Sequence, residues 1–197
     1  MMRLRADRPQ RLATISYRAA APGGGTEGAR LAVERFRVDA LPGGYDAIVA
    51  AGDLQGIAVS PLGGRPGLLG IAVADYLGVW ADDGLLPPPD RVGVLLTGDL
   101  HSAPEADSRG ASGPVGDMWL AFVAAGCPMV FGVAGSHDEV TTEQVGALGR
   151  DIALLKPRAP GLALCGHVSW SEPAARLGGG HVVNVDSRVA VFTAGPG

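Results

Sequence analysis

Residues 46–56 read DAIVAAGDLQG, and this stretch decides the fold class, because a short apolar run ends there in glycine and aspartate. Two later stretches have the same form, VGVLLTGDLH at 92–101 and MVFGVAGSHD at 129–138. Short runs that are apolar on both faces are typical of strands buried between helices in a parallel or mixed sheet. We therefore expect three such strands, each followed by a polar loop.

The rest of the chain alternates between short apolar runs and helical patterns. Further strands are expected at 12–17, 162–165, 182–185 and 189–193. At 32–38 charged residues alternate with apolar ones, which suggests an edge or half-exposed strand. Helices are expected at 68–80, from an N-cap at Ser112 through Val123, and at 142–150. Strands that alternate with helices predict a layered α/β domain.

Composition places the chain among folded proteins of one domain. Its 197 residues are 47% hydrophobic and 18% charged, so we expect a single domain over 11–197 after a disordered arm at 1–10. The chain has no apolar run of the roughly 20 residues that span a bilayer and no apolar signal sequence, which predicts a cytoplasmic protein without a membrane partner. A net charge of −4 argues against general nucleic-acid binding. Cys127 and Cys165 form no CxxC pair and predict neither a disulfide nor a zinc site.

Four of the expected strands end in glycine followed by a polar cluster. The clusters are GDLQG at 52–56, GDLH at 98–101, GSHD at 135–138 and GHVS at 166–169. In an open α/β sheet the carboxyl ends of the strands share one rim, where ligands bind. A single Gly-Asp pair is most often a turn or a helix cap. Four such clusters in series predict a shared site, and Asp and His are residue types that bind divalent metals.

In this order the clusters resemble the motifs of the calcineurin-like metallophosphoesterases, which run D-x-H, G-D-x-x, G-N-H-D/E, an isolated His and G-H-x-H. The resemblance covers about residues 45–192, and RGASGPVGDMW at 109–119 is similar to a bacterial subgroup of the family that carries the GDLQG motif. It implies a layered sandwich of two β-sheets flanked by helices. Only 29 residues separate His137 from His167, so the second sheet is expected to be reduced.

The resemblance also implies a site and a reaction. Metal ligands would be Asp53, Gln55, Asp99, Ser136 and His167, and the catalytic residues would be His137 and Asp138. One or two divalent ions, Mn, Mg, Fe or Zn, would activate water for the hydrolysis of a small phosphate monoester or diester. His101 and Arg109 are candidates for substrate contact, with a polar loop histidine and a solvated loop arginine as the alternatives.

Departures from the family pattern leave other functions open. Gln55, Ser136 and Ser169 stand where the family has His, Asn and His, and the isolated His has no counterpart. Neutral oxygen donors bind Mn, Fe or Zn less tightly than imidazole does. The alternative is therefore a catalytically impaired relative that binds a phosphate-bearing ligand or a protein partner. A third alternative is a shortened chain that forms a homodimer through an exposed sheet edge.

Overall fold

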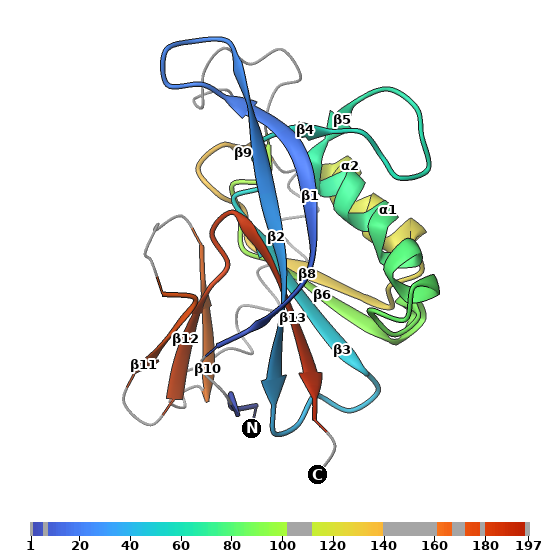
Figure 1. Cartoon of the computed structure of the whole chain (residues 1–197), viewed down its shortest axis with the longest axis vertical. Coiled ribbons are helices and arrows are strands. Elements are labelled where there is room, and N and C mark those ends of the chain that lie inside the picture. Colours follow the sequence, from blue (N-terminus) through green and yellow to red (C-terminus); the bar gives the residue numbers. More distant parts are fainter. Residues whose placement is uncertain are drawn as a thin grey trace.

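The computed structural model describes residues 2–5, 8–101, 112–139, 161–166, 172–177 and 180–195. A large twisted sheet lies at the centre of this part of the chain, with two helices on one face and a small sheet on the other (Figure 1). The expected mixed α/β class is confirmed. Among the residues that the structure describes, no helix is both long and apolar enough to cross a membrane.

The large sheet has eight strands, and three of its strands near one edge run parallel. In spatial order the strands are β5 (Gly67–Leu68), β4 (Ile57–Ala58), β1 (Gln10–Ala20), β2 (Thr26–Val38), β13 (Arg188–Ala194), β3 (Ala47–Gly52), β6 (Val92–Leu96) and β8 (Met129–Gly132). β3 is parallel to β6, and β6 is parallel to β8. The carboxyl ends of these three strands therefore lie at the same rim, as the sequence predicted.

β13 lies in the middle of this sheet, although it comes last in the chain. It runs parallel to β2 on one side and antiparallel to β3 on the other. Its first residue, Arg188, is opposite Gly52, the last residue of β3. The turn that precedes β13 is therefore brought to the rim where β3 ends.

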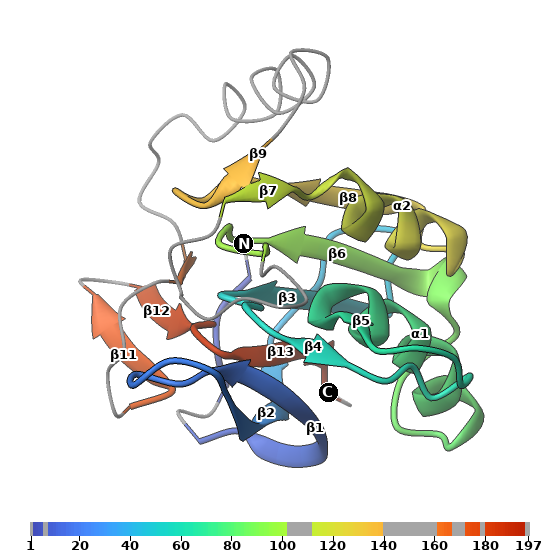
Figure 2. The same cartoon turned by 90° about the horizontal axis from the view of Figure 1, so that it is seen from above.

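Seen from above, the helices lie on one side of the large sheet and the small sheet on the other (Figure 2). Each face of the large sheet has its own hydrophobic core, and alternate residues of β3 contribute to the two cores. Val49 and Ala51 face the helices α1 (Leu69–Asp82) and α2 (Gly116–Ala124). Ile48 and Ala50 face the opposite core. That core includes the stacked rings of Phe36 and Phe192, whose centroids are 5.5 Å apart. Period-two alternation thus buries β3 on both sides.

Two smaller sheets and a short helix complete the described chain. β10 (Leu162–Cys165), β12 (Gly180–Asn184) and β11 (Ala174–Leu177) form a three-stranded sheet in that order, with Val183 in the core opposite the helices. β7 (Gly113–Pro114) and β9 (Asp138–Glu139) pair in parallel. A single 3-10 turn, η1 (Pro89–Arg91), leads into β6.

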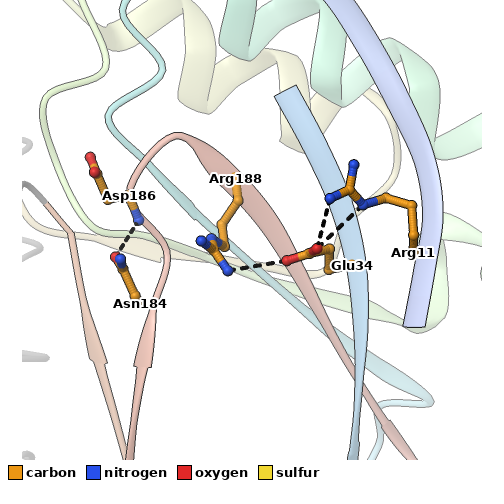
Figure 3. A network of polar contacts seen from close by, with 5 residues as sticks. All are labelled: Arg11, Glu34, Asn184, Asp186 and Arg188. Carbon is orange, nitrogen blue, oxygen red and sulfur yellow. Dashed lines mark hydrogen bonds and ion pairs between the residues drawn. The ribbon is translucent and has the colours of Figure 1, made fainter. Parts of the chain in front are cut away.

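The expectation that residues 32–38 form an edge or half-exposed strand is wrong. β2 lies inside the sheet between β1 and β13, and its Glu34 is buried. Arg11 donates to Glu34 Oε1 from Nε at 3.2 Å and from Nη2 at 3.0 Å, and Arg188 Nη1 donates to Oε2 at 3.1 Å (Figure 3). Neighbouring strands therefore neutralise the charge that the sequence pattern suggested was exposed.

The expectation that 129–134 is buried on both faces is also wrong. β8 is the last strand of the sheet and pairs with β6 alone within the described chain, and Phe131 and Val133 remain 42% and 41% exposed. A strand at an edge lacks a neighbour on one side, so apolar residues there stay partly in water. The predicted dimer through a sheet edge stays a prediction.

Two expectations about helices have different outcomes. α1 confirms the helix expected at 68–80, two residues longer at its end. α2 begins at Gly116 after Val115, so Ser112 is not its N-cap; Gly113 and Pro114 instead pair with β9. The helix expected at 142–150 lies outside the described residues.

The first residues of the chain pair with the end of β2 in the structure. Leu4 forms an isolated bridge with Val38, and the Arg3 N–H donates to Asp39 Oδ1 at 2.7 Å. Amide hydrogen exchange would distinguish a bound arm from a frayed arm, because the amides of a frayed arm exchange faster. The arm predicted at 1–10 and the single domain at 11–197 stay predictions.

Candidate functional site

Three residues in an unusual backbone conformation gather at one rim of the large sheet. Among the described residues other than glycine, Asp53, Asp99 and Ser187 have positive φ, each 50°. Asp53 follows β3, Asp99 follows β6, and Ser187 precedes β13. For an L-residue the left-handed region costs about 1–2 kcal/mol. Such strained residues cluster at functional sites, so the rim is the leading candidate for one.

The loops after β3 and β6 are joined backbone to backbone. Thr97 N–H donates to Ala51 O at 2.9 Å, and Asp53 N–H donates to Gly98 O at 3.0 Å. Gly52 is packed against the Thr97 side chain, which leaves no room there for a Cβ atom. These hydrogen bonds fix the positions of the two aspartates relative to each other.

Each of these aspartates accepts hydrogen bonds from neighbouring loops. Ser187 Oγ donates to Asp53 Oδ2 at 3.2 Å. Ser136 Oγ and the His137 N–H both lie 3.3 Å from Asp99 Oδ1. Asp99 is buried, so these donors replace part of the water that its carboxylate loses. The predicted site residues Asp53, Asp99, Ser136 and His137 are thus brought together.

Asp138 directly follows His137, and its carboxylate accepts hydrogen bonds from backbone N–H groups. Its Oδ1 accepts the N–H groups of Leu100 at 2.8 Å and His101 at 3.0 Å, and its Oδ2 accepts that of Gly135 at 2.9 Å. Hydrogen bonds from backbone amides to a carboxylate are stronger than neutral ones. Asp138 therefore ties the loop after β8 to the loop after β6.

The two described histidines of the rim are held by β7. Gly113 N–H donates to His137 O at 3.0 Å, while the other side of Gly113 is packed against the His101 ring so closely that a Cβ atom would not fit. His101 Nδ1 is buried and has no hydrogen-bond partner among the described residues. A buried imidazole nitrogen in this state calls for an explanation such as water, an ion or a chemical role.

The remaining predicted site residues have different outcomes. Gln55 is half-buried in the loop after β3. His167, Ser169 and Arg109 lie outside the described residues. Gly166, which precedes His167, comes from the three-stranded sheet, and a Cβ atom on it would be 2.9 Å from Thr97 Oγ1. Gly166, the glycine of the fourth cluster, therefore packs against the loop after β6.

The chemistry of the described donors favours a hard cation over a nitrogen-rich centre. Within the described ranges no group of three or more His, Cys, Asp or Glu side chains is placed to hold a metal ion. Asp53 and Asp99 supply carboxylates. Neutral oxygens come from Gln55, two residues after Asp53, and from Ser136, whose Oγ lies 3.3 Å from Asp99 Oδ1. Two carboxylates with neutral oxygens and water fit Mg²⁺ or Mn²⁺.

Sequence reasoning missed Ser187 and Thr97. Ser187 comes from the far end of the chain, 134 residues from the carboxylate that it contacts. Its only local signal is the polar Asp-Ser pair between two apolar strands, a pattern typical of any turn. Thr97 ends the apolar run at 92–97, a pattern that indicates only a strand. In the structure its Oγ1 lies against both Gly52 and Gly166.

Comparison with protein-family models, with curated proteins and with solved structures finds no match to this chain. The site is therefore interpreted from its own residues and geometry.

Proposed function

We propose that this protein hydrolyses a phosphate monoester or diester with the help of one or two divalent cations bound at the rim. The observation that carries the proposal is the pair of left-handed aspartates, Asp53 and Asp99, after neighbouring parallel strands. A backbone strained in the same way at both positions favours a role that requires the carboxylates there.

Asp53 and Asp99 would hold the cation, with Gln55 and Ser136 as neutral oxygen donors. When bound, a divalent cation is a Lewis acid that polarises phosphoryl oxygens and makes water a better nucleophile. The His137 N–H orients the Asp99 carboxylate through the hydrogen bond described above. His167 is a further proposed ligand on the strength of the motif resemblance.

His137 would serve the leaving group. In the reaction the oxygen of water would form a bond to phosphorus as the ester P–O bond breaks. The departing oxygen would take a proton from the protonated His137 imidazole, and the attacking water would release one proton to solvent, which restores the proton on His137. The loop of His137 is fixed through Asp138 and Gly113, so its imidazole starts from a defined position. Asp138 is proposed here as a residue that positions this loop, because both its oxygens are occupied by backbone amides.

We further propose that the chain is a divergent, shortened relative of the calcineurin-like metallophosphoesterases. Support comes from the order of the four motifs, from the rim that the first three share, and from a second, three-stranded sheet on the face opposite the helices. The layered sandwich of that family is part of the proposal. The substrate would be a small phosphate ester.

Metal binding and turnover test this proposal in one preparation. Mn²⁺ is titrated into the purified protein while hydrolysis of an aryl phosphodiester and an aryl phosphate monoester is followed. We expect close to one or two equivalents bound, together with turnover. Asp99→Asn should abolish stabilisation by Mn²⁺ without unfolding the apo protein, while Asp83→Asn on the exposed end of α1 should respond as the wild type does.

The role of His137 has its own test. His137→Ala should reduce turnover of a poor leaving group far more than turnover of an activated aryl phosphate, because only the poor leaving group needs the proton. Equal losses on both substrates would remove His137 from that role.

The impaired relative is the second candidate, and the observation in its favour is the lack of three clustered metal-binding side chains within the described ranges. If the protein showed no bound Mn²⁺ and no turnover, the hydrolase proposal would be overturned. In that case the site would bind a phosphate-bearing ligand or a protein partner without hydrolysis.

A further inference from the structure

The turn between β12 and β13 is built to place one hydroxyl group. Asn184 is buried, and its Oδ1 accepts the N–H of Asp186 at 2.9 Å (Figure 3). Asp186 forms an isolated bridge with Gly52, and Arg188 pairs with the same glycine. Ser187 is therefore fixed on both sides against the end of β3.

We propose that Ser187 is a positioning residue, which holds the carboxylate of Asp53 through its Oγ in the orientation that binds a cation. The contact is the 3.2 Å hydrogen bond from Ser187 Oγ to Asp53 Oδ2. The inference rests on the proposed function, and it adds a residue from the last strand connection to a site otherwise formed by the loops after β3, β6 and β8.

The backbone of Ser187 argues against a role as a simple turn residue. At φ 50° glycine is the residue with the lowest conformational cost. Elsewhere in the described chain every other position with positive φ is glycine, apart from Asp53 and Asp99. A serine at this position, where glycine would avoid a cost of about 1–2 kcal/mol, favours a role for its side chain.

The strand that follows Ser187, β13, is also held by an ion pair at its first residue. Arg188 Nη1 donates to the buried Glu34 at 3.1 Å, and Arg11 binds the other oxygen of the same carboxylate (Figure 3). This bridge joins β1, β2 and β13, so the start of β13 is held by two strands besides β3. The hydroxyl is thereby preorganised before any cation arrives.

Two substitutions separate the hydroxyl from the backbone conformation. Ser187→Ala removes the hydroxyl and keeps a Cβ atom at the left-handed position, whereas Ser187→Gly removes both. We expect both variants to bind Mn²⁺ about 10- to 100-fold more weakly than the wild type, the usual loss when a group that orients a metal ligand is removed. Ser187→Gly should nonetheless unfold at a higher temperature than Ser187→Ala.

The matched control is Ser16→Ala, which removes an exposed serine hydroxyl from β1. It should leave Mn²⁺ affinity unchanged. Mn²⁺ is measured by calorimetry and by the loss of its free electron paramagnetic resonance signal, so the result does not depend on turnover. Wild-type affinity in both Ser187→Ala and Ser187→Gly would overturn the inference.

A double-mutant cycle in the protein without metal makes the test independent of the proposed function. Ser187→Ala, Asp53→Ala and the double variant are compared by urea unfolding. We expect the loss in the double variant to be smaller than the sum of the single losses, because both remove the same hydrogen bond. Additive losses would overturn the inference even if the wild type binds Mn²⁺. If the wild type binds no Mn²⁺, the proposed function fails and the cycle alone decides the Ser187 contact.

Discussion

The carboxylate of Asp138 binds the backbone of Leu100, 38 residues earlier in the chain, at 2.8 Å. The same oxygen accepts the N–H of His101, and the second oxygen accepts that of Gly135. One side chain therefore organises the loops after β6 and β8. The position of Asp99 relative to Ser136 and His137 depends on it.

Replacement of Asp138 should lower the stability of the fold. Asp138→Ala leaves three backbone N–H groups without their acceptor, and we expect the free energy of unfolding in urea to fall by about 2–4 kcal/mol. Asp138→Asn should also be destabilising, because its NH₂ group cannot accept a hydrogen bond. The adjacent Glu139→Gln is the control, since Glu139 is exposed, and a wild-type midpoint for Asp138→Ala would refute this role.

Two glycine substitutions should act in opposite directions. A Cβ atom on Gly135 would overlap the Asp99 backbone nitrogen and Oδ1, so Gly135→Ala should displace the loops and lower the melting temperature. Gly78 lies inside α1 with open space around it, and Gly78→Ala should stabilise the protein by up to about 1 kcal/mol. Thermal unfolding of both variants checks this, and equal shifts would contradict the close approach at Gly135.

Removal of the buried Glu34 should be costly because Arg188, whose side chain is only 18% exposed, would remain unneutralised. We expect Glu34→Ala to lower the free energy of unfolding by about 3 kcal/mol, within the range for breaking a buried ion pair. The comparison is Asp46→Ala, which removes an exposed partner of Arg91 and should leave the unfolding curve unchanged within error. If both variants left the free energy of unfolding equally unchanged, the ion pairs of Glu34 would not contribute to stability.

Cys127 should make stability depend on alkaline pH. Burial raises the pKa of the Cys127 thiol from 9.0 to about 11. The unfolded chain therefore releases this proton first, and the contribution to stability is fully present below pH 9 and is lost as the pH rises toward 11. The stability difference between the wild type and Cys127→Ala should narrow over that range in urea unfolding, whereas a constant difference would contradict it.

Sequence patterns predicted the main strands because those strands follow local rules. The apolar runs at 46–51 and 92–97 are short and bounded by glycine or aspartate, and residues 47–51, 92–94 and 96 are buried as expected. Parallel pairing then placed Asp53 and Asp99 at one rim. These two steps need only periodicity and the geometry of α/β sheets.

Features set by distant strands could not be predicted in this way. The charge of Glu34 suggested an exposed β2, because its partners on β1 and β13 are distant in sequence. The apolar residues of β8 gave no sign that β8 is an edge strand within the described chain. Ser187 is the same case at the site, since its contact joins two ends of the chain. Strand order, which brings such residues together, is not encoded in any local window.

The central position of β13 sets the order in which the protein can fold during its synthesis. Among the described strands, the hairpin of β1 and β2 is joined to the parallel group of β3, β6 and β8 only through β13. A nascent chain therefore carries two unjoined pieces of sheet until residues 188–194 have left the ribosome. Both pieces expose strand edges during that time, which makes the incomplete chain a natural substrate for chaperones.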